Sequence, residues 1–577
     1  MRNEVYETLL TPYAEEMNES APWSVYPRPQ LKRASFFSLN GKWDFKIITN
    51  LDTPPYFDGE ILVPFPPESK LSGVEKRIPD DAALIYERSF TLPEDFKSER
   101  VILHFGAVDQ IASVFINGKE AGVHTGGYIP FSFDVTELLC DGENEITVRA
   151  RDELSKTYTY GKQKKNRGGM WYTPVSGIWQ TVWLESVPKN YVESIKIEPL
   201  SEAVKITVNA DAEYKKLTLK SGEVYEFTEK SIIVEPREKH FWTPENPYLY
   251  EFTLETETDK IESYFALRTL EIKEVNGRKR LCLNGEPYFF SGLLDQGYFP
   301  DGIFLPATEK GYEDDILNAK RLGFNMLRKH IKIEPMIFYY LCDKLGMVVF
   351  QDMVNNSGYS FILDTALPTV GFKKARFSLR HKNKESREFF LSEMEKTAEL
   401  LYNVPSVCLY TIFNEGWGQF MPDEAYKALR EIDSTRFIDS TSGWFYAAES
   451  DVDSRHIYFK APKIKKPNGR PFFLSEFGGF SLRIEGHLFG KRNYGYSIYK
   501  DKEGFTDAVY SLYTADTLPL IKDGLSATVY TQLTDVEDET NGLITYDRRV
   551  LKIDGNKMKD ANEKLFKAFS DCTKTIK

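Results

Sequence analysis

The spacing of apolar residues changes once along this chain, near Gly285, and this change constrains the fold more than any other feature. Before Gly285, apolar and polar residues alternate with a period of two in short segments, which is the pattern of half-buried β-strands. After it, apolar runs of strand length alternate with amphipathic helical stretches. The sequence therefore predicts β-sandwiches followed by a domain built from both strands and helices.

The first third of the chain is predicted to form one β-sandwich, because its short strands are separated by turn signals such as Asn117-Gly118. The strands expected here are Gly41–Ile47, Ile85–Phe90, Ala112–Ile116, Glu145–Ala150 and Thr181–Glu185. The next segment, from about residue 189 to 274, contains Val204–Val208 and Leu249–Leu254. It has the length of an immunoglobulin-like sandwich, although it lacks the Cys…Trp…Cys signature.

The remainder, residues 286–577, fits a closed (β/α)8 barrel, because eight strand-like runs alternate with helical stretches. The runs are Tyr288–Leu294, Asn325–His330, Met347–Asp352, Val407–Phe413, Arg436–Ser440, His456–Tyr458, Phe472–Phe477 and Ala527–Gln532. The expected helices include Tyr312–Leu322, Pro335–Leu345 and Lys384–Leu401. A doubly wound open sheet is the alternative, but no Gly-rich phosphate or dinucleotide loop follows any strand.

Composition and charge exclude several classes of protein. With 41% hydrophobic and 28% charged residues, the chain is typical of a folded globular protein. A net charge of −12 argues against a nucleic-acid partner. No apolar run approaches the roughly 18 residues that span a bilayer, and Met1–Tyr6 lacks the apolar core of a signal peptide. Five widely spaced cysteines indicate buried free thiols rather than a disulfide framework or zinc site, so a cytoplasmic location is expected.

Polar residues stand at the predicted carboxyl ends of the barrel strands, where (β/α)8 barrels carry their active sites. Taken singly, any of them is more often a structural cap than a functional group. The set consists of Asp295, Gln296, Arg328, His330, Asp352, Asn414, Glu415, Tyr458, Glu476, Gln532 and Asp535.

Two carboxylates in this set, Glu415 and Glu476, each stand between an apolar strand and glycines, so both are expected to project into an enclosed site. A buried glutamate is costly without a partner or a task, and either one alone is explained equally well by an ion pair. Paired carboxylates at a barrel mouth indicate glycoside hydrolysis. Asn414 is then placed to donate to the sugar 2-hydroxyl. Trp417 either offers an apolar face to the ring or packs in the core.

These residues, with several others, resemble glycoside hydrolase family 2, which contains β-galactosidases, β-glucuronidases and β-mannosidases. The matching stretches are Ser176–Gln180, Leu283–Pro287, Leu322–His330, Asn414-Glu415 and Ser475–Gly478, in the order of the family. The resemblance implies a jelly-roll sugar-binding-like domain at 1–187, an immunoglobulin-like domain at 188–273 and a catalytic (β/α)8 barrel at 274–577.

The resemblance also implies a retaining mechanism in which Glu415 is the acid/base and Glu476 the nucleophile. Retention requires the two carboxyl groups to lie roughly 5–5.5 Å apart. Tyr458 corresponds to the family tyrosine beside the nucleophile, and Arg328 and His330 to residues that orient the nucleophile and bind sugar hydroxyls. By position alone, weaker candidates for hydroxyl binding are Asp295, Asp352 and Gln532.

One stretch departs from the family pattern. Bacterial β-glucuronidases of the family pair the substrate carboxylate with an Asn-x-Lys element, whereas the corresponding Thr534–Gly542 holds four acids and no lysine. A carboxylated sugar is therefore disfavoured unless another cation serves. Arg483, Lys491 and Arg492 are candidates for that cation, although a solvated loop explains them better.

The sequence therefore predicts an exo-acting, retaining β-glycosidase that resembles a β-galactosidase and acts on a carbohydrate substrate. The alternatives are a β-uronidase and, from another class, a catalytically inactive carbohydrate-binding protein. No spacing of His, Asp or Glu demands a metal, and no cofactor is expected. Members of the family are often oligomers, so a homo-oligomer stays open.

Overall fold

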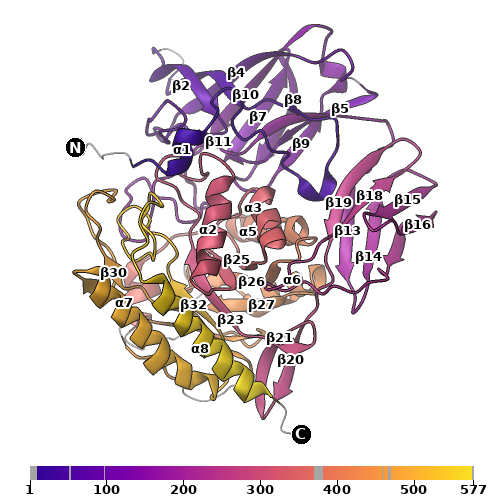
Figure 1. The fold of residues 1–577 in the computed structure, drawn as a ribbon. Helices are drawn as coiled ribbons and strands as arrows, with labels where there is room; N and C mark the ends of the chain where they lie inside the picture. Colours follow the sequence, from indigo (N-terminus) through magenta and orange to yellow (C-terminus); the bar gives the residue numbers. More distant parts are fainter. Residues whose placement is uncertain are drawn as a thin grey trace.

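The computed structural model describes residues 9–50, 53–96, 98–369, 381–458, 460–464 and 469–574. It contains two β-sandwiches and a (β/α)8 barrel, which confirms the predicted fold class (Figure 1). The first sandwich lies above the barrel, and the second lies beside both. The expectation that Met1–Tyr6 carries no signal peptide falls outside the described residues.

The first sandwich packs a six-stranded antiparallel sheet against a four-stranded one around an apolar core that includes Trp43, Tyr86 and Phe105. The larger sheet has the order β3 (Phe57–Val63), β2 (Gly41–Ile48), β4 (Ala83–Thr91), β10 (Glu143–Arg151), β7 (Ile111–Ile116), β8 (Lys119–Thr125). The smaller has the order β1 (Phe37–Ser38), β12 (Val182–Val187), β5 (Arg100–Phe105), β9 (Phe131–Asp134), and a further pair joins β6 (Val108–Asp109) to β11 (Gly177–Ile178). Asn117 and Gly118, both at positive φ, form the predicted turn between β7 and β8.

The second sandwich consists of seven strands in two sheets, as expected for an immunoglobulin-like fold. One sheet is β13 (Ser194–Pro199), β14 (Val204–Asn209), β17 (Ser231–Val234), and the other is β16 (Val224–Phe227), β15 (Lys215–Leu219), β18 (Tyr250–Glu255), β19 (Lys260–Phe265). Alternate residues of β14 and β18 point inward, so that Ile206, Phe252 and Leu254 meet in its core. A three-stranded sheet of β20 (Leu270–Val275), β21 (Arg278–Leu283) and β22 (Glu286–Pro287) leads into the barrel, and the predicted boundary at 273/274 falls within β20.

Eight parallel strands form the barrel, and each overlaps one of the eight predicted runs. In spatial order they are β27 (Phe437–Ser442), β26 (Val407–Asn414), β25 (Val348–Asp352), β24 (Met326–Lys329), β23 (Phe290–Asp295), β32 (Leu525–Thr531), β29 (Phe472–Gly478) and β28 (Asp453–Ile457). Among the described residues, no backbone ladder joins β27 to β28. Side chains meet across this gap, because the hydroxyls of Ser442 in β27 and Ser454 in β28 lie 3.2 Å apart.

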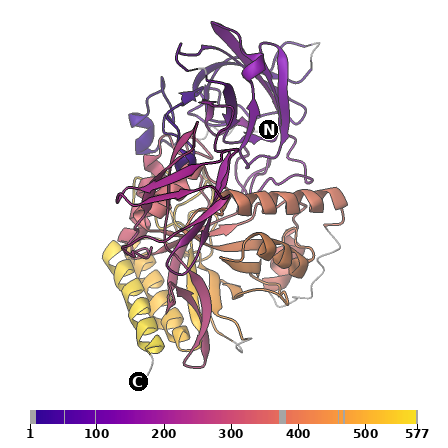
Figure 2. The same cartoon turned by 90° about the vertical axis from the view of Figure 1, so that its right-hand side faces the viewer.

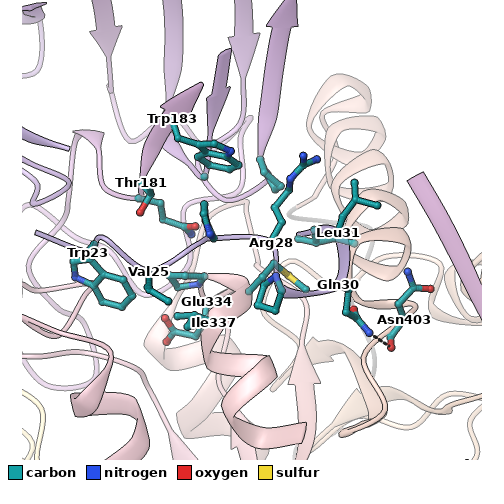
Figure 3. A pocket seen from close by; sticks show the side chains of 18 of the residues that line it. Trp23, Val25, Arg28, Gln30, Leu31, Thr181, Trp183, Glu334, Ile337 and Asn403 are labelled. Atoms are coloured by element: carbon teal, nitrogen blue, oxygen red, sulfur yellow. Dashed lines mark hydrogen bonds between the residues drawn. The ribbon is translucent and has the colours of Figure 1, made fainter. Parts of the chain in front are cut away.

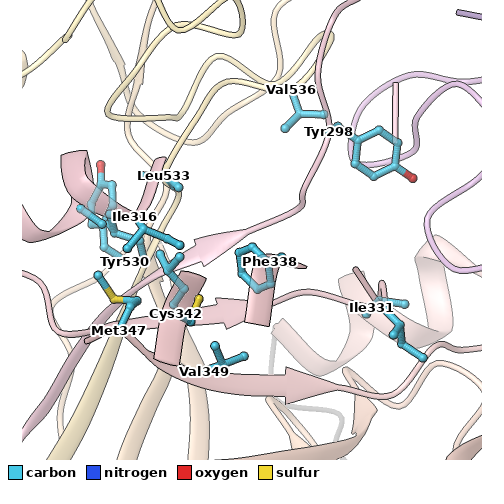
Figure 4. Close-up of a cluster of buried hydrophobic side chains, with 14 of the residues drawn as sticks. Tyr298, Ile316, Ile331, Phe338, Cys342, Met347, Val349, Tyr530, Leu533 and Val536 are labelled. Carbon is cyan, nitrogen blue, oxygen red and sulfur yellow. The ribbon is translucent and has the colours of Figure 1, made fainter. Parts of the chain in front are cut away.

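Helices cover the outside of the barrel (Figures 1 and 2). They are α2 (Lys310–Arg321), α3 (Met336–Leu345), α5 (Lys384–Leu401), α6 (Pro422–Ile432), α7 (Lys502–Ser511) and α8 (Gly555–Thr573). The short α1 (Pro12–Glu16) precedes the first sandwich, and the short α4 (Leu367–Thr369) lies in the connection between β25 and α5. The bounds of α5 match the prediction, and Asn383 caps this helix by accepting from the amides of Glu385 and Ser386. Figure 4 shows how Ile316 of α2 and Phe338 of α3 pack toward Val349 of β25.

A segment of the first sandwich, residues 152–176 between β10 and β11, reaches the barrel, and we call it the bridging segment. Tyr160 donates from its amide and its hydroxyl to the carbonyls of Asn355 and Ser357, at 3.2 and 2.5 Å, in the loop after β25. Thr173 donates its amide to Oε1 of Glu537 at 2.7 Å. The first sandwich therefore contributes to the mouth of the barrel.

A cavity of about 230 Å³ remains where the two sandwiches and the barrel meet (Figure 3). Its walls are mostly apolar and include Trp23, Leu31 and Ile337. Gln30 lines it and donates to the carbonyl of Asn403 at 2.8 Å. This contact joins the segment before β1 to the loop between α5 and β26 of the barrel.

The five cysteines are free thiols, as expected, and three of them, Cys282, Cys342 and Cys408, are buried. Cys140 is exposed and Cys572 is half-buried, so the expectation of burial fails for these two. No helix among the described residues combines the length and the apolar character that crossing a bilayer requires.

Candidate active site

Glu415 directly follows β26, a strand that is buried along its whole length. Its φ of +53° is unusual for a residue with a side chain, and its amide donates to the carbonyl of Ser442 at 2.8 Å. Gly416 follows at φ +73°, where a Cβ would lie 2.2 Å from the Phe445 ring. The chain therefore turns sharply after the strand, and only glycine fits the second position of the turn.

Glu476 lies in β29 and is held at both carboxylate oxygens. Arg328 donates from Nη1 to Oε1 at 3.0 Å, and the hydroxyl of Tyr458 donates to Oε2 at 2.6 Å. Both donors stabilise a negative charge, and the Arg328 guanidinium supplies the opposite charge. Glu476 is therefore poised as an anion.

The two carboxylates face each other across the barrel mouth. A carboxylate oxygen of Glu415, one of Glu476 and a ring nitrogen of His456 all lie within 4.8 Å of one another. This separation fits the short spacing of retaining glycosidases rather than the roughly 6.5–9.5 Å of inverting ones. Burial raises the pKa of Glu415, an effect that the positive charges of Lys162, His330 and Arg328 partly oppose. The pair thus combines Glu476, whose donors stabilise an anion, with Glu415, whose raised pKa favours the protonated form.

Arg328 organises this region from the end of β24, where it is completely buried. Nε donates to Oδ1 of Asp352 at 2.9 Å, and Nη2 donates to Oδ1 of Asn414, also at 2.9 Å. Because the amide oxygen of Asn414 is occupied, its amide nitrogen is the group that can donate to a ligand. Arg328 therefore holds both Glu476, the nucleophile candidate, and the side-chain amide of Asn414 in place.

His330 and Asp352 form a buried pair beside Arg328, with Nδ1 of His330 2.6 Å from Oδ2 of Asp352. Burial lowers the pKa of His330, although Asp352 opposes this effect. Burial alone raises the pKa of Asp352, but Arg328 and His330 outweigh it and hold the pKa below its ordinary value. Asp352 is thus a charged partner of two site residues.

The structure also brings His456 into the site, which the sequence analysis missed. Nδ1 lies 2.8 Å from Oε1 of Glu415, and Nε2 lies 2.9 Å from the hydroxyl of Ser442 and 3.4 Å from Oε1 of Glu476. Burial lowers its pKa to about 3, so the imidazole is neutral. Strand alternation could have identified His456, because it lies two residues before Tyr458 and therefore on the same face.

Three other candidates make their contacts within the protein framework. Asp295 accepts from Nζ of Lys329 at 2.5 Å, and the same Nζ also donates to Glu334, so the three charges form a buried network. Gln532 donates to Oε2 of Glu539 at 2.8 Å. Trp417 is buried and packs edge to face on Trp171 of the bridging segment, with ring centroids 5.0 Å apart.

The acidic stretch after β32 is largely neutralised by cations. Lys552 pairs with Asp535 at 2.6 Å, and Arg167 of the bridging segment lies 3.1 Å from Glu537 and 3.6 Å from Asp538. Of the four acids, Glu539 alone has no ion pair to a described residue, and burial raises its pKa to about 7. The repulsion expected for a carboxylated sugar is therefore concentrated at Glu539.

Arg483, one of the alternative cations, donates to the carbonyls of Lys491 and Arg492 at 3.2 and 3.4 Å. It also lies 3.9 Å from the exposed Glu485. These contacts belong to a surface loop.

In the described part of the chain, three potential metal-ligating side chains gather at one place, namely Glu415, His456 and Glu476. Their ligand atoms already take part in the hydrogen bonds given above. Coordination of a cation would replace those bonds and occupy both carboxylates.

Three family models match the chain in order. They are "Glycosyl hydrolase 2 galactose-binding domain-like" over residues 72–181, "Glycosyl hydrolases family 2" over 190–268, and "Glycosyl hydrolases family 2, TIM barrel domain" over 278–467. Glu415 lies within the range matched by the barrel model, and Glu476 lies beyond it.

Curated relatives include a beta-galactosidase of Thermoanaerobacter pseudethanolicus, 24% identical over 451 residues, which cover 71% of this chain and 54% of that protein. A beta-galactosidase of Pseudoalteromonas haloplanktis is 25% identical over 380 residues, covering 55% and 35%. The chain thus spans about half the length, or less, of these relatives.

Similar solved structures include an uncultured Clostridium sp. beta-glucuronidase, with a TM-score of 0.72 and 20% identity, covering 93% of this chain and 99% of that one. A beta-galacturonidase of Eisenbergiella tayi has a TM-score of 0.67 and 19% identity, covering 92% and 97%. At these identities the likeness establishes the fold. Since the three family models together cover more than half of the residues, the chain belongs to glycoside hydrolase family 2.

Proposed function

We propose that this chain is a retaining β-glycosidase that releases a terminal β-linked sugar through Glu476 and Glu415. The observation that carries the proposal is the pair of carboxylates, with oxygens within 4.8 Å and opposite surroundings. Glu476 accepts from Arg328 and Tyr458, and the half-buried Glu415 lies beside the neutral His456. Such a difference assigns the anionic nucleophile and the protonated acid.

In the first step, an oxygen of Glu476 forms a bond to the anomeric carbon while the bond from that carbon to the glycosidic oxygen breaks. Glu415 gives its proton to the departing oxygen, so the leaving group departs as a neutral alcohol. The burial that raises the pKa of Glu415 favours the protonated form that this step requires. The amide nitrogen of Asn414 is placed to donate to the sugar 2-hydroxyl.

In the second step, the ionised Glu415 removes a proton from water, and the water oxygen attacks the anomeric carbon. The bond to Glu476 breaks and its electron pair returns to the carboxylate, which Arg328 and Tyr458 again stabilise. Two inversions give net retention. His456, 2.8 Å from Oε1 of Glu415, orients this carboxyl group in both steps.

A galactoside is the leading substrate, because both curated relatives above are beta-galactosidases. A β-uronide is the second candidate, since the similar solved structures are a beta-glucuronidase and a beta-galacturonidase. A catalytically inactive carbohydrate-binding protein is the rival from another class, and the intact carboxylate pair argues against it. The free cysteines favour a reducing compartment, and we place the activity in the cytoplasm.

The test is a panel of nitrophenyl β-glycosides of galactose, glucose, glucuronate, galacturonate, mannose and fucose. We expect hydrolysis of at least one, with the β-anomer as the first product in an NMR time course. Glu476→Gln should abolish turnover and leave the fold intact, whereas Glu485→Gln, at an exposed position, should change neither. Full turnover by Glu476→Gln, or an α-anomer as first product, would contradict a retaining mechanism with Glu476 as the nucleophile.

A further inference from the structure

Lys162 is a buried cation of the first sandwich that lies at the mouth of the barrel. It belongs to the bridging segment and is only 7% exposed. Its ammonium lies 5.8 Å from the centroid of the Trp171 ring, and Trp171 packs on Trp417, two residues after Glu415. No hydrogen bond or ion pair links this ammonium to a described residue.

The other buried lysines of the described chain behave differently. Nζ of Lys329 donates to Asp295 at 2.5 Å, Nζ of Lys332 to Glu334 at 2.9 Å and Nζ of Lys552 to Asp535 at 2.6 Å. Lys215, in the second sandwich, donates to two backbone carbonyls. Lys162 is the exception among these lysines, because no described residue accepts from its ammonium, which is left to water or to a ligand.

The backbone around Lys162 is fixed against the barrel as well as against its own sandwich, where the hydroxyl of Tyr128 donates to the carbonyl of Tyr160. The amides of Tyr160 and Gly161 both donate to the carbonyl of Asn355, at 3.2 and 3.1 Å. At Gly161, with φ +63°, a Cβ would lie 2.9 Å from the carbonyl oxygen of Ile331, the residue after His330. Only glycine allows this approach, which presents Lys162 to the loops that follow β24 and β25.

The charge of Lys162 acts on three groups of the candidate site. Among the opposing charges it is the largest influence that lowers the burial-raised pKa of Glu415, and likewise that of Glu539. It also adds to the effect of burial in lowering the pKa of His330. These influences agree with the contacts of Gly161 with Ile331 and of Trp171 with Trp417, which place Lys162 beside the mouth of the barrel.

We propose that Lys162 and Glu539 are a specificity pair for a neutral sugar. Lys162 donates to a hydroxyl oxygen of the reacting sugar, and Glu539 accepts from a hydroxyl of the same sugar. A neutral hydroxyl supplies both an acceptor and a donor, so it satisfies both groups. A sugar carboxylate would satisfy Lys162 but meet Glu539 as a like charge. The inference rests on the proposed function and narrows it to neutral hexosides.

The principal variant is Lys162→Met, and its matched control is Lys164→Met. Lys164 is exposed and lies 5.4 Å from the centroid of the same Trp171 ring, so both variants remove one cation from one aromatic contact. We expect Lys162→Met to lower kcat/KM for the preferred neutral glycoside at least about 30-fold, in line with the loss of a charged hydrogen bond. Lys164→Met should stay within about twofold of the parent protein.

Two further readouts separate ligand binding from a structural role. Removing an unpaired buried charge should raise the melting temperature of the ligand-free protein, whereas loss of a structural lysine would lower it. The basic limb of the pH profile of kcat/KM should move to higher pH in Lys162→Met, because Lys162 lowers the pKa of Glu415. Lys162→Arg should recover part of the activity by keeping the charge.

Direct binding keeps this test apart from that of the proposed function. Free galactose should bind the parent protein more tightly than Lys162→Met in calorimetry, even if no glycoside is hydrolysed. Unchanged affinity and unchanged kcat/KM in Lys162→Met would overturn the proposal. So would a parent protein that hydrolyses only uronides and loses that activity in Lys162→Met, since Lys162 would then pair a carboxylate. Glu539→Gln should raise the ratio of uronide to neutral-sugar turnover.

Discussion

The hydroxyl of Tyr458 lies 2.6 Å from Oε2 of Glu476 and donates to it. Arg328 donates to the other oxygen of the same carboxylate, so the nucleophile candidate is held in one orientation by two elements of the barrel. When Glu476 is bonded to a sugar, its carboxylate charge disappears and the hydrogen bond weakens. The Tyr458 hydroxyl thus stabilises the free carboxylate of Glu476 more than its ester with the sugar. The strength of this hydrogen bond therefore changes between the two steps of the reaction.

Tyr458→Phe should lower kcat about 10²-fold, the scale seen when a single hydrogen-bond donor is removed from a charged reaction centre. The ring is retained, so its stacking on Tyr496 with centroids 4.1 Å apart should persist. Steady-state kinetics on the best substrate of the panel will measure this. Tyr446→Phe, at an exposed position, is the control. Equal kcat in the parent and Tyr458→Phe would contradict a role for this hydroxyl.

Glu415→Gln should separate the two chemical steps. A dinitrophenyl glycoside needs little acid assistance, so the first step should persist, while the second step loses its base. The glycosyl-enzyme should accumulate as one added sugar in intact-mass spectra. Azide, which attacks without a base, should restore turnover and give the β-glycosyl azide. Absence of both the mass shift and the azide product would argue that Glu415 has another role.

Zinc ions should inhibit the protein reversibly. The ligand atoms of Glu415, His456 and Glu476 lie within 4.8 Å of one another, and imidazole and carboxylate are ligands that Zn²⁺ accepts. Bound zinc would neutralise the nucleophile, and EDTA should restore the rate. EDTA alone should leave the untreated protein fully active, since the proposed chemistry uses no metal. His456→Asn should weaken zinc inhibition at least about tenfold if the imidazole is a ligand.

Asp343 should make the protein less stable as the pH rises. Burial raises the pKa of this carboxyl to about 7, while Ser406 and Tyr264 donate to it. Between its ordinary pKa and 7, the folded state holds a proton that the unfolded state releases. The free energy of unfolding therefore falls with pH, by up to about 1.4 kcal/mol per pH unit for one proton, and levels off above pH 7.

Asp343→Asn mimics the protonated carboxyl and should flatten this slope between pH 5 and 7. Denaturant unfolding at several pH values will measure it. Asp95→Asn, at an exposed position, should leave the slope unchanged. A slope in Asp343→Asn equal to that of the parent would show that Asp343 does not carry the proton.

The barrel was predictable because its local signals agree with its tertiary packing. The helix Lys384–Leu401 has its predicted bounds because Asn383 caps it and its apolar face is regular. The meeting of Glu415 and Glu476 followed from parallel strands, whose carboxyl ends lie at one edge. These features depend on residues close in sequence or on a known symmetry of the fold.

The parts of the site that sequence did not reveal depend on contacts between distant segments. For Trp417 the sequence left a sugar-facing and a core position open, and the contact with Trp171 of the first sandwich has no local signal. Lys162 stands in a basic run that ends at Arg167 and reads as a solvated loop. Its burial arises from the approach of Gly161 to Ile331, which no local pattern encodes.

The bridging segment has a consequence for engineering. Tyr160 and Gly161 hold the first sandwich against the loop after β25, so the mouth of the barrel is assembled from two domains. The barrel is therefore not a portable module: excising it, or grafting it behind a foreign sandwich, would remove part of its own wall. Recombination that keeps the bridging segment with its barrel should give active chimaeras more often than exchange at the domain boundaries.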